Sequence, residues 1–189
     1  RVSNEGGVVT SEPVALLKAR MVEVVGGALP ETSELAGQVV ADFRIGKYEV
    51  TWGEWKAVRD WATSHGYDDL GGVGQGIGDR HPVTDVNWFH VVKWCNARSE
   101  KEGLNPVYVL DGAPYRTGQP LDSSSVGARL AMNGYRLPLE AEWEWAARGG
   151  ASSLGYTYSG GNSLDAVGWY GANSGGEVRS VGGKLANEL

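Results

Sequence analysis

The sequence YRLPLEAEWEWAARGG, at residues 135–150, decides the fold of this chain. Pro138 stands where a helix would begin, a place where the missing backbone N–H of proline costs nothing. The glycine pair at residues 149–150 then ends the helical pattern. We therefore predict a helix over residues 139–148. Trp143 precedes two alanines by one turn, which favours close packing of this helix on a sheet.

Arg136, just before this helix, has a planar guanidinium that binds carboxylates through two parallel hydrogen bonds. Its partner would be Glu140, Glu144 or a carboxylate elsewhere in the chain. We expect an internal ion pair that stabilises the fold.

Two more helices are predicted upstream. The first begins at Thr51, which forms a capping box with Glu54, and ends at Gly66. The second covers residues 87–102, with Asn87 as its N-cap and Gly103 as its stop. Apolar residues at helical spacing give each helix one buried face. They are Trp52, Trp55, Val58, Trp61 and Ala62 in the first helix, and Trp88, Val91, Val92 and Cys95 in the second.

Short β-prone runs and long connections fill the remaining chain. Strands are predicted at residues 21–27, 39–48 and 107–110, and residues 66–80, which hold six glycines, are predicted as a loop. Residues 151–189 have no helical period and are predicted as short strands and turns. The fold class is therefore α+β and irregular, with about three helices, short antiparallel strands and long Gly-rich loops.

Residues 1–20 are predicted as an N-terminal hairpin that turns at residues 4–7, with the sequence NEGG. Their pattern resembles the last two strands of bacterial immunoglobulin-like modules, and an ordinary hairpin is the alternative. We expect this segment to be separate from a main domain at residues 21–189.

Composition excludes several classes of protein. The 189 residues include 17 basic and 23 acidic side chains, and a net charge of −6 argues against a nucleic-acid platform. No apolar run approaches the length of about 20 residues that spans a bilayer. One Cys cannot form an internal disulfide. Eight Trp against two Phe favour shallow cores, grooves and interfaces, because buried Trp needs a partner for its N–H.

Three phrases in order carry a family resemblance: GKYEVT at residues 46–51, HPV followed by VNW at residues 81–88, and the stretch at residues 135–150. Together they resemble the sulfatase-modifying factor family, the formylglycine-generating-enzyme domain with its variant of the C-type lectin fold. The similarity covers residues 21–189. The motif residues are expected to be structural, and they are Arg136, Pro138, Glu140, Glu142, Trp143 and Arg148. Where the family usually has Thr, this chain has Leu139, so a capping hydroxyl is lost at a cost of about 1 kcal/mol.

The resemblance also points to chemistry that this sequence lacks. The family's enzymes oxidise a substrate Cys with a pair of Cys near the end of the domain, whereas Cys95 is the only thiol here and is expected to act as a small hydrophobe. His65, His81 and His90 do not have the spacing of metal ligands. No catalytic or cofactor-binding residue is assigned. The resemblance further implies a C-terminally incomplete domain. Either the chain is a fragment of a longer gene product, or a partner chain completes its sheet.

Calcium is a further metal that the resemblance makes possible. Asn173 is the nearest matching position and Asp165 a weaker one, and oxygen ligands in a Gly-rich loop suit Ca²⁺. Turn-forming Asn and Asp give the same pattern without metal, and we favour the turn.

The preferred hypothesis is a non-catalytic binding or interaction module of a secreted or envelope-associated bacterial protein, in the extracellular space or the periplasm. Tyr, Trp, Ser, Asn and Gly crowd residues 152–176, a composition typical of adaptable recognition loops. The ligand would be a protein or a small molecule. One alternative is a formylglycine-generating-type oxidoreductase with its Cys pair beyond Leu189. The other is a structural assembly subunit.

Overall fold

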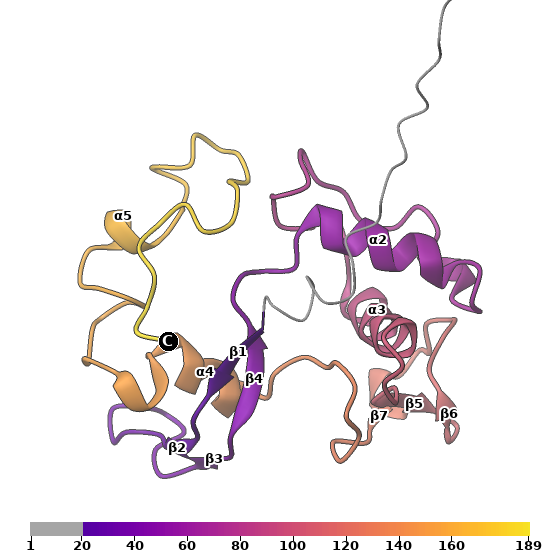
Figure 1. Cartoon of the computed structure of the whole chain (residues 1–189), viewed down its shortest axis with the longest axis horizontal. Helices are drawn as coiled ribbons and strands as arrows, with labels where there is room; N and C mark the ends of the chain where they lie inside the picture. Colours follow the sequence, from indigo (N-terminus) through magenta and orange to yellow (C-terminus); the bar gives the residue numbers. More distant parts are fainter. Residues whose placement is uncertain (1–20) are drawn as a thin grey trace, which may run out of the picture.

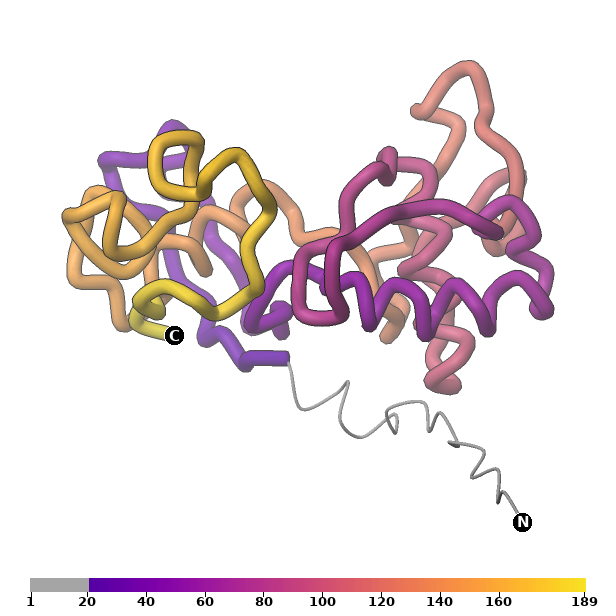
Figure 2. The backbone as a smooth tube through the Cα atoms, turned by 90° about the horizontal axis from the view of Figure 1, so that it is seen from above, coloured from indigo at the N-terminus to yellow at the C-terminus, as the bar shows by residue number. Residues whose placement is uncertain are grey.

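The computed structural model describes residues 21–189. The hairpin predicted for residues 1–20 lies outside the described residues. The chain is mixed α+β with short antiparallel strands, as the sequence predicts. Its two halves lie side by side along the long axis of the molecule (Figures 1 and 2). We call residues 50–137 the helical half, and residues 21–49 with 138–189 the loop half.

The helical half is built on α2 (Trp52–Ala62) and α3 (Trp88–Lys101), which pack against each other. A three-stranded antiparallel sheet has the order β6 (Ala113–Pro114), β5 (Tyr108–Leu110), β7 (Gly127–Ala128). Two 3₁₀ turns, η1 (Asp68–Leu70) and η2 (Ser123–Ser125), complete this half.

The loop half has two small antiparallel ribbons, in which β1 (Met21–Val24) pairs with β4 (Phe43–Gly46) and β2 (Gly27–Ala28) pairs with β3 (Val39–Val40). Helix α4 (Glu140–Ala147) packs beside β3, and η3 (Gly150–Ser152) and the single turn α5 (Leu164–Val167) follow. Gly149, with φ of 91°, ends α4, and a Cβ there would fall 2.6 Å from Oε2 of Glu188. This glycine therefore ends the helix and also leaves room for the Glu188 side chain near the C-terminus.

The helix predictions agree closely with the structure at their starts. Thr51 and Glu54 form the predicted capping box, and the amide of Asn87 caps α3. Helix α2 ends at Ala62, four residues before the predicted stop at Gly66, because residues 63–66 continue as a turn. The turn α5 was not predicted, since four residues are too few to show a period.

The prediction of one continuous strand at residues 39–48 is wrong, because the segment forms two strands. The chain breaks between β3 and β4, where the Asp42 carboxylate accepts the Gly26 N–H at 2.8 Å. The matching break between β1 and β2 lies at Gly26, where a Cβ would fall 2.1 Å from the Val40 carbonyl oxygen. Two chain segments cross too closely here for straight strands.

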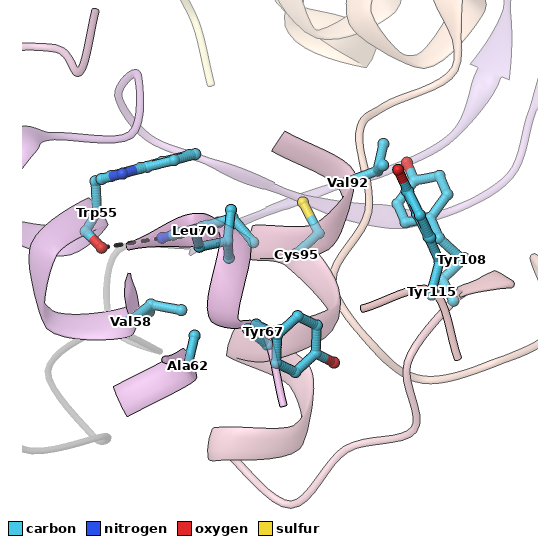
Figure 3. Packing of buried hydrophobic residues seen from close by; sticks show 12 residues of the cluster. Trp55, Val58, Ala62, Tyr67, Leu70, Val92, Cys95, Tyr108 and Tyr115 are labelled. Atoms are coloured by element: carbon cyan, nitrogen blue, oxygen red, sulfur yellow. Dashed lines mark hydrogen bonds between the residues drawn. The ribbon is translucent and has the colours of Figure 1, made fainter. Parts of the chain in front are cut away.

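Twelve buried residues form the core of the helical half (Figure 3). At its centre the rings of Trp55 and Trp94 stack at 5.4 Å with an interplanar angle of 2°. The Trp94 indole N–H donates to the Trp55 carbonyl at 3.1 Å, and the Trp55 indole donates to the Val73 carbonyl at 2.9 Å. Both buried indoles thus have the partners they need.

Asn96 ties α3 to the sheet. Its fully buried amide donates to the carbonyls of Tyr108 and Tyr115 at 2.8 and 3.1 Å. Its oxygen accepts the backbone N–H groups of Val107 and Tyr108 at 3.1 and 2.9 Å. One side chain therefore makes four hydrogen bonds to backbone groups, of which the Tyr108 carbonyl also accepts the Tyr115 N–H at 3.0 Å.

Two core predictions need correction. The segment predicted as a patternless loop at residues 66–80 contains η1, and its residue Leu70 and the preceding Tyr67 are fully buried. Trp88, predicted on the buried stripe of α3, is 41% exposed. The reason is its place in the first turn, since residues 92–99 are enclosed while residues 88–91 lie at the edge of the core.

The loop half has a smaller core of Val24, Leu29, Val40 and Trp145. The Trp145 indole donates to the Val25 carbonyl at 2.9 Å. Among residues 21–189, no helix has the length and apolar character to cross a bilayer.

Candidate functional site

The motif around α4 fixes the start of this helix through hydrogen bonds. Both terminal nitrogens of Arg136 donate to the Glu142 carboxylate at 2.7 Å, which makes the predicted internal ion pair bidentate. Glu140 and Glu144, the partners named from the sequence, are not used. Glu142 is the third residue of α4, so its carboxylate reaches back and also accepts the Leu139 N–H at 2.7 Å. These hydrogen bonds, chiefly those from Arg136, lower the pKa of Glu142.

The other motif residues line the outside of α4. Glu144 and Arg148 pair at 2.7 Å one turn apart, and Glu140 is exposed. Trp143 itself is 61% exposed, although α4 packs beside β3 as the sequence predicts. Ala141 and Trp145 hold the buried face of the helix, which places Trp143 on the opposite side.

Cys95 is buried in the core of the helical half, among the hydrophobic residues drawn in Figure 3. Burial raises the pKa of its thiol to about 12. The thiolate, which is the nucleophile and metal ligand, therefore does not form near neutral pH.

The three histidines serve separate local contacts. His65 stacks on Trp61 with ring centroids 3.9 Å apart, His81 lies 3.3 Å from the Ser180 hydroxyl, and His90 caps α3. Within residues 21–189, no three His, Cys, Asp or Glu side chains gather in a way that could hold a metal ion.

Asp165 and Asn173, the calcium candidates, do come together. The Asn173 amide nitrogen lies 3.3 Å from an Asp165 carboxylate oxygen and donates to the Gly168 carbonyl at 3.0 Å. Its oxygen accepts the Tyr170 N–H at 2.9 Å. The Tyr170 hydroxyl donates to the same Asp165 oxygen at 2.7 Å, which raises the pKa of Tyr170. The two side chains thus close a turn around Tyr170.

This arrangement does not fit a calcium ion. The Asn173 oxygen already accepts a hydrogen bond, its NH₂ group faces Asp165, and the Lys184 ammonium donates to the Asp165 carbonyl. Calcium needs six to eight oxygen ligands, and a neighbouring ammonium repels a cation. The turn is the better interpretation of this pair.

Exposed aromatic side chains follow one another through the C-terminal loops. Tyr156, Tyr158, Trp169 and Tyr170 are all exposed by 38–45%. Trp169 has the Lys184 ammonium 3.9 Å from its ring centroid and the Arg179 guanidinium at 5.8 Å. The hydrogen bond from the Tyr170 hydroxyl to Asp165 and the two cations beside Trp169 hold these two rings at the surface.

A depression of about 280 Å³ lies where the two halves meet. Its lining has no ionisable side chain and includes Trp52, Gln75, Ile77, Pro82, Thr84 and Val178. A Cβ at Gly76 would fall 2.4 Å from the Trp52 side chain, so the Gly-rich loop can lie flat on this ring. Ile77 is 70% exposed at the rim. Sequence reasoning missed this site, although an isolated Ile between glycines was a usable signal.

The C-terminal loops reach this depression through a short bridge. The Val181 N–H donates to the Arg80 carbonyl at 2.9 Å, and the Ser180 hydroxyl lies 3.3 Å from the His81 ring. Val178 on the same segment forms one wall of the depression. Val178 therefore links the depression to the chain segment that follows the aromatic loops.

Comparison with known proteins gives consistent relatives. The sequence matches a family model described as the sulfatase-modifying factor enzyme 1-like domain over residues 7–187. A Paenibacillus barcinonensis protein named chaperone protein LppX is 34% identical over 194 residues, which cover 89% of this chain. The chain spans 65% of the length of that relative.

Two solved structures share the fold at 30% sequence identity, each over 89% of this chain. The crystal structure of CarF has a TM-score of 0.76, with 73% of its chain covered. Treponema denticola variable protein 1 has a TM-score of 0.67, with 66% of its chain covered.

Proposed function

The chain belongs to the sulfatase-modifying factor enzyme 1-like domain family, and from this premise we propose that it is a non-catalytic module that binds another polypeptide. The binding surface consists of the aromatic loops at residues 154–170 and the depression bordered by Trp52, Ile77 and Val178. The resemblance of the sequence to the formylglycine-generating domain concerns the scaffold, and the function of this chain lies in the surface loops.

The state of Cys95 carries this proposal. The thiol chemistry of the family requires ionised, accessible cysteines, and the only thiol of this chain is buried with its pKa raised to about 12. No second cysteine is present to form a disulfide with it.

The chemistry of the surface supports a polypeptide as the ligand. Tyr and Trp side chains offer large contact area at a low entropic cost, and the depression is uncharged and of a size for apolar side chains. A relative that carries the name chaperone protein agrees with a role in binding polypeptides.

We also propose an extracellular or periplasmic setting in a bacterium, and a domain boundary near residue 20. Both remain predictions from the sequence. In that setting the module would bind its polypeptide partners outside the cytoplasm.

Suppression of aggregation tests the binding function. Reduced, denatured lysozyme should scatter less light in the presence of the protein, and Trp169→Ala should weaken this effect. Trp143→Ala is the matched control, because it removes an equally large exposed ring from α4. If both variants protect as well as the wild type, or if the wild type gives no protection, the proposed surface is wrong.

A peptide oxidation assay tests the enzymatic alternative. The protein is incubated with copper, oxygen and a Cys-containing sulfatase peptide, and the peptide mass is measured. We expect no formylglycine product. Product that disappears in Cys95→Ala would establish catalysis by this chain.

An assembly subunit is the second candidate, and one observation favours it. Leu139, the N-cap of α4, and Trp143 within the helix are exposed by 47% and 61%, and the ribbons beside that helix have two strands each. Such a face suits a partner chain that completes the sheet. Light scattering would then give a stable complex that Trp143→Ala dissociates, whereas the binding module alone is monomeric.

A further inference from the structure

His90 occupies an unusual place for a histidine, the third residue of α3 in a reciprocal cap. The His90 N–H donates to the Asn87 side-chain oxygen at 3.0 Å, and the Asn87 N–H donates to Nδ1 of His90 at 3.2 Å. In an ordinary capping box, Glu or Gln at this place accepts the second bond over the whole neutral and mildly acidic range. Histidine accepts it only while Nδ1 has a free lone pair.

We propose that His90 makes the start of α3 sensitive to acid: the neutral imidazole closes the cap, and its protonation opens the cap and loosens residues 83–88. The protonated ring has N–H groups on both nitrogens, so Nδ1–H would face the Asn87 N–H. The bond to Asn87 is then replaced by a repulsion between two donors.

The groups around His90 make this protonation specific. Nε2 lies 3.2 Å from the Gln119 amide, on the loop that packs against α3. Nδ1 accepts from the backbone of Asn87, so Nε2 carries the proton of the neutral ring. The Gln119 amide nitrogen occupies the position 3.2 Å from Nε2, and the amide must turn over to present its oxygen to this proton. That bond survives protonation, so the effect of acid falls on Asn87 alone.

Charged groups from two elements oppose each other at the ring. Lys93, one turn later on α3, disfavours a positive ring, and Asp69 on η1 favours it. The Asp69 carboxylate is already bound by the Lys93 ammonium at 2.5 Å and by the Gly118 N–H at 2.7 Å. The positive end of the helix dipole also disfavours the charged ring. Partial burial and Lys93 outweigh Asp69, and the pKa of His90 lies below 6.5.

The sign of the pH effect follows directly. A lowered pKa in the folded protein means that the cap stabilises the fold above about pH 6.5, the ordinary pKa of histidine. This stabilisation is lost as the pH falls through the pKa of the folded protein.

Residues 83–88, which this cap holds in place, include Thr84 in the lining of the depression. Asp85 has φ of 55°, a conformation that costs energy for residues other than Gly, and it lies between the cap and Thr84. Thr84 exchanges two backbone hydrogen bonds of 2.9 Å with Gln75, and both residues line the depression. If the proposed function holds, acid would therefore weaken binding at this site.

Hydrogen exchange with mass spectrometry tests the cap on the whole chain. On going from pH 7.5 to pH 5.5, and after correction for intrinsic rates, residues 83–91 of the wild type should exchange about fivefold faster. His90→Gln keeps an acceptor that does not titrate, so this change should vanish. His65→Gln, which leaves the cap intact, should behave as the wild type.

NMR titration gives an independent readout, in which the His90 ring should titrate below pH 6.5, the ordinary value for histidine. The proposal is overturned if His90→Gln responds to acid as the wild type does, or if His90 titrates at or above pH 6.5. Lysozyme protection at the two pH values separates the regulatory role. The regulatory role is supported if acid weakens the suppression of lysozyme aggregation and His90→Gln restores it. If hydrogen exchange shows the expected acid response but the protein never suppresses aggregation, only the proposed function is contradicted.

Discussion

The two halves of this molecule are held together by different means. Twelve buried residues and the Asn96 network fix the helical half, whereas the core of the loop half contains four buried residues. Two short ribbons and local hydrogen bonds, such as the 2.8 Å bond from the Asn187 amide to the Ala146 carbonyl, hold the rest of the loop half. This difference separates a stable base from loops that can adapt to a partner.

Removing the central ring of the helical half should have the largest effect. Trp55→Ala deletes a stacked, fully buried indole and should lower the free energy of unfolding by about 3–5 kcal/mol. Trp145→Ala should instead speed hydrogen exchange at residues 21–46 and 138–150 and leave α2 and α3 protected. Chemical denaturation and hydrogen exchange measure the two effects, and equal loss of protection in both halves would refute the division.

Asn96→Ala should come next, with a loss of about 3 kcal/mol, because it removes four hydrogen bonds to the backbone inside the core. Asn105→Ala on the surface is the control and should change stability little. A denaturation midpoint for Asn96→Ala equal to that of the control would show that the network does not hold the sheet to α3.

The ion pair that links the halves should have an intermediate effect. Arg136→Lys loses the bidentate geometry and should cost about 2 kcal/mol. Because the pKa of Glu142 is lowered, its contribution is present above the unfolded pKa, near 4.5, and is lost as the pH falls through the folded value. Unfolding measured from pH 7 to pH 3 should therefore show a smaller acid loss in Glu142→Gln than in the wild type.

The smallest effects should come from the loop half. Asn173→Ala opens the turn around Tyr170 and should cost about 1 kcal/mol in thermal unfolding. Added CaCl₂ should not shift the melting temperature. A calcium site filled at 100 times its dissociation constant would add about 2.7 kcal/mol, so a clear upward shift would restore the calcium interpretation.

Sequence reasoning succeeded where a helix has a cap and a periodic apolar face. The caps at Thr51 and Asn87 and the stop at Gly149 were predictable because each depends on residues within a few positions. The role of Glu142 was missed because its partner choice depends on where the helix begins. Local patterns also could not show that the segment at Val178 reaches the loop at Gln75, about 100 residues away in the chain.

The central claim is that the C-terminal loops bind a polypeptide while the helical base stays unchanged. Hydrogen exchange of the protein with and without reduced, denatured lysozyme tests it most directly. We predict slower exchange at residues 154–182 and around Ile77, with α3 unchanged. Protection confined to α2 and α3, or no protection anywhere, would contradict the account.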